Sequence, residues 1–567
     1  MKNLRINLVY FLIFLCSCLI IARLVYLQLI KGEIYLALAK GQQEIFQPIS
    51  GSRGEIFLYD KDNLFLSAIN KYSKYCYVSP KLISDKELVS QELSRVLDLD
   101  KENLLSKIEQ DNSLFLVLKR GISQEQAEAI EDLALKNVYI AEEVVRSYPN
   151  DELASDVLGF VNQDSKGQYG VEGYWNDILT GKEGWQKLEH GPFGRFIQGD
   201  TEFTSKGADL VLTIDKNIQF QAERILSDFS ERFNYETGQM IVIDPKTGRV
   251  LAMVDFPSFD LNHYQDYSEI EVFQNKSIQA LYEPGSVFKA VTMAAAINEG
   301  LISPETTYID KGYVDVTDKR INNYENRVWG EVTMTEVLEK SINTGAVFAQ
   351  SKLENKVFLD YLKRFGVFEQ TGIGLQGEVY SENREFKKGW AVNYATAAFG
   401  HGIEMTPIQV ARAYCVFANQ GKMIEPYIVE GVRQGAETKS LREQNEPVQV
   451  VSRETAETIV KMLVSVAENG YSKPARVPSY YIAGKTGTSQ ISFSALGINK
   501  SGYSDQTWQS FVGFAPAFNP SFVILVKLDN PATRSSNESA TLVFKEMAKY
   551  ILDYYQIPPD KEEATLE

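Results

Sequence analysis

The sequence predicts an α+β protein in which an apolar N-terminal helix precedes two folded domains. A run of apolar residues at 7–30 opens the chain, and helical and strand-like patterns then alternate up to about residue 204. From residue 205 onward, pairs of strand-like runs stand at both ends of a segment that also contains several helical patterns. Strand pairs far apart in sequence, with helices between them, favour an antiparallel sheet whose faces the helices cover.

The apolar run at 7–30 is expected to be a membrane anchor. About 20 apolar residues span a bilayer, and Arg23, the only charge in the run, lies near one end, where its side chain reaches the interface. Lys2 and Arg5 precede the run and place residues 1–6 in the cytoplasm, with the rest of the chain outside. Two alternatives are disfavoured. A cleaved signal peptide lacks its small-residue site here, and a lipoprotein-like Leu15–Cys18 stretch is followed by more apolar residues.

The two domains are expected at 33–204 and 205–557. The first mixes helices and strands without gathering polar residues into a recognisable site, which favours a structural or partner-binding role. In the second, apolar runs at 239–243 and 250–254 flank an Asp-Pro-Lys-Thr-Gly turn and predict a hairpin.

Helix signals follow the hairpin. A helix is expected from Ser286 to Asn298, and Thr333 with Glu336 forms a capping box that starts another helix leading to Ser341. The remaining elements are a helix from Pro407, two strands within 507–529, a helix over 539–554 and a polar tail at 558–567.

Composition and charge exclude several classes of protein. The chain has 567 residues, of which 44% are hydrophobic and 23% charged, as in folded proteins of two or three domains. A net charge of −17 argues against a nucleic-acid partner, since phosphate binding requires a basic surface. The four cysteines and three histidines show no metal-like spacing, so neither a metal nor another cofactor is expected. Two cysteines lie in the apolar run, and whether Cys76 and Cys415 pair stays open. The histidines are His190, His263 and His401, few candidates for a histidine-based serine hydrolase.

Three short motifs carry the chemistry of the second domain. They occur in the order Ser-x-x-Lys, Ser-x-Asn and Lys-Thr-Gly, which together indicate a serine nucleophile activated by lysine. Each motif is weak alone, because Lys246–Gly248 is a second Lys-Thr-Gly and Ser535–Asn537 a second Ser-x-Asn. The first of these lies in a hairpin turn and the second in a polar stretch between a strand and the last helix, so we expect both outside the site. The candidate site residues are therefore Ser286, Lys289, Ser341, Asn343, Lys485, Thr486, Gly487 and Thr488.

The spacing of Ser286 and Lys289 suits nucleophilic catalysis. Positions i and i+3 share a helix face, so the Lys289 amine can reach the Ser286 hydroxyl, which needs an adjacent base. Lysine acts as a base only if its pKa falls from about 10.4, through burial and a neighbouring cation such as Lys485. Lys485 is also suited to attract a substrate carboxylate, and Ser341 to relay a proton to a leaving amine. Asn343 is expected to orient a substrate amide. The helix N-terminus at Ser286 and the 485–488 strand are expected to donate hydrogen bonds to the oxyanion.

With these motifs the chain resembles a class B penicillin-binding protein, the monofunctional peptidoglycan transpeptidase type. The segments RLVYLQLIKGEIY, SRGEIFLYDKDN, GQYGVEGYWNDILTGKEG and FGHGIEMTPIQVARAYCVFANQG resemble blocks of that family, and the likeness covers nearly the whole chain. The resemblance implies an elongated pedestal or dimerisation domain and a penicillin-recognising domain, with a five-stranded antiparallel sheet and helices on both faces. It implies a single-pass protein of the bacterial cytoplasmic membrane with its catalytic domain outside.

The resemblance also implies the reaction and the partners. Ser286 would attack the D-Ala-D-Ala amide of a peptidoglycan stem peptide, release D-alanine, and pass the acyl group to an amine of a neighbouring stem. Lys289 would be the base, Ser341 and Asn343 the second motif, and 485–488 the carboxylate-binding strand. β-Lactams would acylate Ser286 as inhibitors. A membrane-embedded glycosyltransferase and other division or elongation proteins would be partners of the anchor and of residues 33–200.

One feature of the chain departs from the family pattern, and another distinguishes two types within the family. Many relatives have a glycine pair and a proline before the last helix, where this chain has SSNESATLVF, and this difference concerns the acceptor side of the site. The asparagine of Ser341-Ile342-Asn343 resembles the septal type more than the elongation type, although an elongation role stays open.

Three competing functions fit the sequence less well, namely a β-lactamase, a β-lactam sensor and an inactive scaffold. A lactamase would not need the large membrane-proximal domain. A sensor would need a cytoplasmic domain, for which residues 1–6 leave no room. A scaffold would not need three intact motifs.

Overall fold

The computed structural model describes residues 52–181, 206–435, 437–442 and 446–561, together with the backbone of three strands and the single helical residues Phe14 and Ile20. The expected anchor at 7–30 thus lies outside the described residues, those two apart. In the part of the chain that the structure describes, no helix combines the length and the apolar character needed to cross a membrane.

The chain divides into two compact units, Met1–Gly54 with Thr180–Ala208, and Glu55–Leu179 with Asp209–Glu567. The first unit contains an antiparallel three-stranded sheet in the order β1-β8-β9. Its strands are β1 (Glu44–Ile49), β8 (Gly184–His190) and β9 (Phe196–Thr201).

The second unit begins with a seven-stranded sheet. Its order is β19-β18-β10-β2-β3-β4, and β5 also pairs with the long strand β3. Strands from the two segments of this unit meet where β10 runs parallel to β2. The strands are β2 (Ile56–Asp60), β3 (Asn63–Val78), β4 (Leu116–Ile122), β5 (Val138–Ser147), β10 (Asp209–Asp215), β18 (Val429–Gln434) and β19 (Glu437–Ser440).

Three capped helices pack beside β3–β5. Each starts at a side chain that accepts a hydrogen bond from the first turn, namely Asp85, Asp100 and Ser123. Their apolar faces bury a separate core with β3 and β4, as the alternating patterns of this region predict. The helices are α3 (Lys86–Leu97), α4 (Lys101–Gln110) and α5 (Gln124–Asp132).

An antiparallel five-stranded sheet, in the order β12-β11-β23-β22-β21, forms the centre of the C-terminal region. The hairpin expected at 239–254 is confirmed as β11 and β12, and the two strands expected within 507–529 are β22 and β23. Strand β21 lies at one edge, so one side of its backbone is free to face a ligand. The strands are β11 (Thr237–Ile243), β12 (Val250–Phe256), β21 (Ala483–Ser492), β22 (Tyr503–Ala515) and β23 (Phe522–Asp529).

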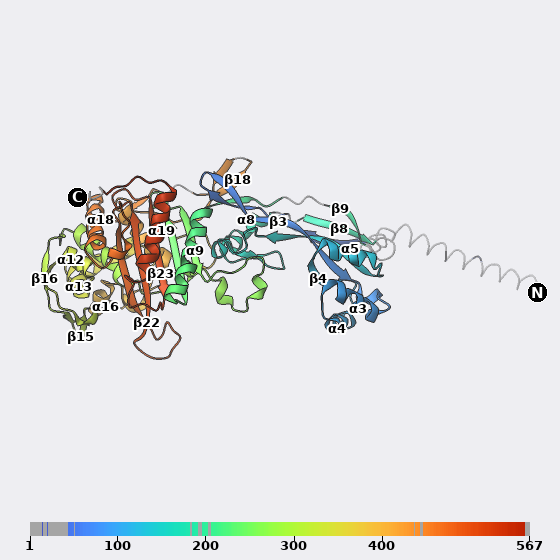
Figure 1. Ribbon diagram of the computed structural model, residues 1–567, viewed down its shortest axis with the longest axis horizontal. Coiled ribbons are helices and arrows are strands. Elements are labelled where there is room, and N and C mark those ends of the chain that lie inside the picture. The colour runs from blue at the N-terminus through green and yellow to red at the C-terminus, as the bar shows by residue number, and fades with distance from the viewer. Residues whose placement is uncertain are drawn as a thin grey trace, which may run out of the picture. The chain divides into compact units, whose positions relative to one another are not determined.

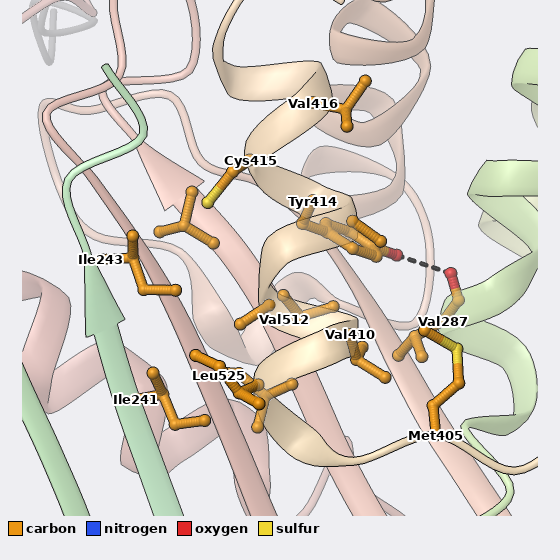
Figure 2. Close-up of a cluster of buried hydrophobic side chains, with 14 of the residues drawn as sticks. Ile241, Ile243, Val287, Met405, Val410, Tyr414, Cys415, Val416, Val512 and Leu525 are labelled. Carbon is orange, nitrogen blue, oxygen red and sulfur yellow. Dashed lines mark hydrogen bonds between the residues drawn. The ribbon is translucent and has the colours of Figure 1, made fainter. Parts of the chain in front are cut away.

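Helices cover both faces of this sheet, as predicted, because strand residues alternate between its sides. Met240 and Val242 of β11 belong to one core, with α9 (Lys216–Phe233) and α19 (Ala540–Tyr554), which lie beside the strands in Figure 1. Ile241 and Ile243 belong to the other core. They pack with α17 (Pro407–Ala418), whose side chains Figure 2 shows between β11 and the turn at Val287. Helices α11 (Lys289–Asn298), α12 (Met334–Glu339), α13 (Asn343–Ser351) and α18 (Arg453–Glu468) complete this layer.

The helix boundaries follow the expected signals, with one correction. The capping boxes Thr333/Glu336 and Thr406/Gln409 both form. Ser286 does not cap a helix, because it lies within a 3₁₀ turn, Gly285–Phe288, that leads directly into α11. The Ser286 hydroxyl is therefore not used as a helix cap.

The two described cysteines do not pair. Cys76 lies buried in the core beside α3–α5, and Cys415 is buried on α17 in the core of the five-stranded sheet. The question that the sequence left open is settled, since both are free thiols.

Candidate active site

Ser286 is held in a turn that is fixed from two sides. The Gly285 amide donates to the carbonyl of Gly400 (3.1 Å), and the two backbones are so close that a Cβ on Gly400 would lie 2.2 Å from the Gly285 oxygen. From the other side, the buried Tyr414 hydroxyl donates to the Val287 carbonyl (2.7 Å; Figure 2). Helix α17 thereby positions the turn that presents the serine.

Lys289, one turn further along, is fully buried and contacts the second motif. Its Nζ donates to the Ser341 carbonyl (2.5 Å) and to Asn343 Oδ1 (2.8 Å), and lies 3.2 Å from Ser341 Oγ. Burial lowers the pKa of Lys289 well below its usual value, and the nearby charge of Lys485 lowers it further. A neutral amine has two protons, which the two carbonyl oxygens accept, so its lone pair is left for a hydroxyl.

The second motif occupies the loop between α12 and α13. Ser341 adopts a left-handed conformation (φ 53°), and the amide of Ile342 donates back to Val337 (2.9 Å), which closes the end of α12. Asn343 opens α13 and donates from Nδ2 to the Asn322 carbonyl (3.3 Å), which leaves its Oδ1 toward Lys289.

The left-handed backbone conformation of Ser341 is expected to lower the stability of the fold, because a residue with a side chain is strained there. A left-handed residue at a helix end is usually glycine, and another residue there costs about 1 kcal/mol. We therefore expect Ser341→Gly to unfold with a free energy about 1 kcal/mol higher than Ser341→Ala, measured by thermal or urea denaturation. Both variants lose the hydroxyl, so the comparison isolates the backbone at this position. Equal stability of the two variants would show that Ser341 is not strained.

Strand β21 presents the third motif. Lys485 is fully buried, and its Nζ donates to Ser341 Oγ (3.0 Å) and to the Thr486 carbonyl (3.2 Å). Burial lowers the pKa of Lys485 to about 7. Gly487 lets the strand approach the turn that contains Ser286, because a Cβ there would lie 2.9 Å from the Pro284 carbonyl and 2.5 Å from Ser510 Oγ. The Ser341 hydroxyl thus lies between two buried lysines.

A cavity of about 770 Å³ opens over these groups. Of the eight predicted site residues, five line it, namely Ser286, Ser341, Asn343, Thr486 and Thr488. Lys289, Lys485 and Gly487 are buried behind this lining. The structure therefore brings all eight together, with the hydroxyl residues of the three motifs facing the cavity and both lysines withdrawn from bulk water.

The second Ser-x-Asn was wrongly placed outside the site. The stretch from Arg534 to Glu538 lines the cavity, because the segment before α19 folds back beside β21 and its Ser536 contacts Thr488 (2.9 Å). The second Lys-Thr-Gly does lie elsewhere, in the exposed turn after β11, where Lys246 donates to Asn519 (2.9 Å).

Two further parts of the cavity lining lie outside the three motifs. His401 is one of them, and burial together with the Lys289 charge lowers its pKa to about 4. His401 belongs to the FGHG stretch, in which Gly400 packs against the turn that contains Ser286. That stretch was the available signal. The connection between β15 (Lys319–Asn322) and β16 (Gly330–Thr333) forms another wall, through residues between Asn322 and Trp329.

Comparison with known proteins agrees with this geometry. Residues 238–549 match the family model described as the penicillin binding protein transpeptidase domain, and residues 48–212 match the penicillin-binding protein dimerisation domain. Stage V sporulation protein D of Bacillus subtilis is 33% identical over 90% of this chain and 79% of its own length. Peptidoglycan D,D-transpeptidase FtsI of Escherichia coli is 29% identical over 91% of this chain and 87% of its own. The solved structure of penicillin binding protein 3 from Mycobacterium tuberculosis, complexed with ampicillin, shares the fold. Its TM-score is 0.70 at 24% identity, over 91% of this chain and 98% of that chain.

Proposed function

Because this chain belongs to the class B penicillin-binding proteins, we propose that it cross-links peptidoglycan stem peptides through an acyl-enzyme on Ser286. The observation that carries the proposal is the convergence of two buried lysines on the Ser341 hydroxyl, beside the turn that presents Ser286. Such a pair keeps one lysine neutral near physiological pH, which an activating base requires.

In the acylation step, the Ser286 oxygen attacks the carbonyl carbon of the penultimate D-alanine while its proton passes to Lys289. The tetrahedral oxyanion is stabilised by backbone amides of Ser286 and of the edge strand β21. When the intermediate collapses, the C–N bond to the terminal D-alanine breaks. The proton then moves from Lys289 through the Ser341 hydroxyl to the leaving amine, a route that the 3.2 Å contact supports. The products are an ester on Ser286 and free D-alanine.

The second step reverses these roles. An acceptor amine from a neighbouring stem peptide loses a proton to Lys289 and attacks the Ser286 ester, which forms the new amide and restores the serine hydroxyl. The hydroxyls of Thr486 and Thr488 line the cavity and are suited to bind the substrate's terminal carboxylate. The buried Lys485 charge favours the same carboxylate without touching it.

The cellular setting is part of this proposal. The asparagine at position 343 favours a role at the division septum over one in elongation, and the apolar run at 7–30 favours a single membrane anchor. The anchor and residues 33–200 are then the surface for a membrane-embedded glycosyltransferase and other division proteins. Peptidoglycan stem peptides are the substrates and β-lactams the inhibitors, and no nucleic acid is involved.

The reaction of the chain with one β-lactam distinguishes the proposed transpeptidase from a β-lactamase, when the covalent adduct is followed until it is released. We expect the detergent-solubilised full chain to gain the mass of one benzylpenicillin and to keep it for many minutes, because a transpeptidase deacylates slowly with water. Ser286→Ala should gain no mass, and its circular dichroism should match that of the unmutated chain. Rapid release of penicilloate with multiple turnovers would identify a lactamase instead.

A further inference from the structure

The segment between β23 and α19 forms part of the cavity wall, and Gln509 of β22 fixes it there. Gln509 is fully buried and pairs with Thr488 in the strand register. Its Oε1 accepts from Thr533 Oγ1 (2.8 Å) and Ser539 Oγ (2.6 Å), while its Nε2 donates to the Thr533 carbonyl (2.8 Å). Both ends of the 533–539 segment are thus tied to the strand next to β21.

This anchorage brings Ser536 against Thr488. The Ser536 amide donates to Thr488 Oγ1 (3.2 Å), and the two hydroxyl oxygens lie 2.9 Å apart. Ser536 is 1% exposed, whereas Thr488 is half-buried and lines the cavity. Among the described residues, Thr488 is the one partner that the Ser536 hydroxyl has.

Burial decides which hydroxyl donates. If Thr488 donated to Ser536, the proton of the buried Ser536 hydroxyl would have no acceptor, at the cost of an unsatisfied buried donor. If Ser536 donates, both lone pairs of Thr488 Oγ1 are occupied, by the Ser536 amide and hydroxyl, and its single proton is free. Because the open side of Thr488 is the cavity, that proton is directed toward a ligand.

We propose that Ser536 is a positioning residue, which makes Thr488 a dedicated hydrogen-bond donor to the carboxylate of the substrate or of a β-lactam. This inference rests on the proposed function. It also gives a physical role to SSNES, the stretch in which the chain departs from the glycine-rich pattern of many relatives. In this chain the stretch supplies a buried hydroxyl, which determines the direction of one proton.

The test compares benzylpenicillin, which carries a free carboxylate, with its methyl ester, which does not. Second-order acylation constants are measured for the full chain and for Ser536→Ala. We expect Ser536→Ala to lower the constant for benzylpenicillin about 10-fold, as for a lost hydrogen bond to a charged group, and to leave the ester within about two-fold. The preference for the free carboxylate therefore falls by about the same factor.

Two further variants distinguish the positioning of Thr488 by Ser536 from a general disruption of the segment between β23 and α19. Thr541→Val removes a hydroxyl that donates to the Asn537 carbonyl (3.0 Å) in the same segment without touching Thr488, and should keep the preference. In a Thr488→Val background, Ser536→Ala should cause no further loss, because the proton it directs is already absent.

An equal loss with both compounds, or no loss with either, would overturn the inference while the unmutated chain still forms its adduct. Additive losses in the double variant would overturn it too. Absence of any adduct on the unmutated chain would instead overturn the proposed function, and the inference with it.

Discussion

Lys289→Met is expected to lower the rate of acylation by a β-lactam about 10³-fold or more, since it removes the group that we propose as the base for the Ser286 proton. Methionine matches the length of the lysine stem and suits the fully buried position. The Ser341 carbonyl and Asn343 Oδ1 lose their donor, but the unfavourable burial of an amine is removed as well. We therefore expect the free energy of unfolding to change by less than about 2 kcal/mol. Stopped-flow acylation and urea denaturation of the same preparation measure both effects.

Lys289→Arg is the matched control for a base. A guanidinium donates hydrogen bonds to the same oxygens but does not lose its proton in proteins. If Lys289 acts by accepting a proton, the arginine variant is as inactive as the methionine variant. Activity in Lys289→Arg within about 10-fold of the unmutated chain would contradict the base and leave Lys289 a role in orientation only.

Lys485→Met is expected to lower acylation at neutral pH about 10²-fold and to change the shape of its pH profile. For the unmutated chain we expect acylation to rise with pH as Lys289 loses its proton, and to fall above about 7 as Lys485 loses its own. The charge of Lys485 is one cause of the lowered Lys289 pKa. Removing that charge raises the Lys289 pKa, so the rising limb moves to higher pH and the falling limb disappears. Second-order acylation constants from pH 5 to 10 measure both limbs.

Lys485→Arg tests whether deprotonation of Lys485 causes the falling limb of the pH profile. Arginine stays protonated through this range, so the charge beside Lys289 is retained at every pH. The rising limb should then stay in place while the falling limb is lost. A falling limb that persists in both Lys485 variants would show that another group causes it.

The motifs of the sequence predicted the site better than they predicted its environment. Ser286 and Lys289 are close in sequence and belong to one turn and the helix that follows it, so local spacing was enough to predict that they lie at the same end of that helix. Their link to Lys485 was expected from the order of the motifs alone. The sheet that carries Lys485 was predicted because its strand pairs leave short apolar runs in the sequence, as at Gln239–Ile243 and in the 507–529 segment.

Long-range packing explains what the sequence did not predict. Ser536 was assigned to a polar connection, and only the anchorage of that connection by Gln509 brings it to Thr488. Lys485 was expected to act as a cation beside Lys289 and to attract a substrate carboxylate, but the sequence did not predict that its amine lies under the cavity lining and donates to Ser341 and Thr486. The direction of a buried side chain depends on partners from other elements, and no local pattern encodes it.

Acyl transfer from a stem peptide tests the central claim most directly. A pentapeptide ending in D-Ala-D-Ala is incubated with the full chain and isotopically labelled D-alanine, and exchange of the terminal residue is followed by mass spectrometry. The account predicts exchange by the unmutated chain, with the peptide acyl group trapped as an ester on Ser286, and neither in Ser286→Ala. Exchange by Ser286→Ala at the unmutated rate, or an ester on another residue, would contradict it.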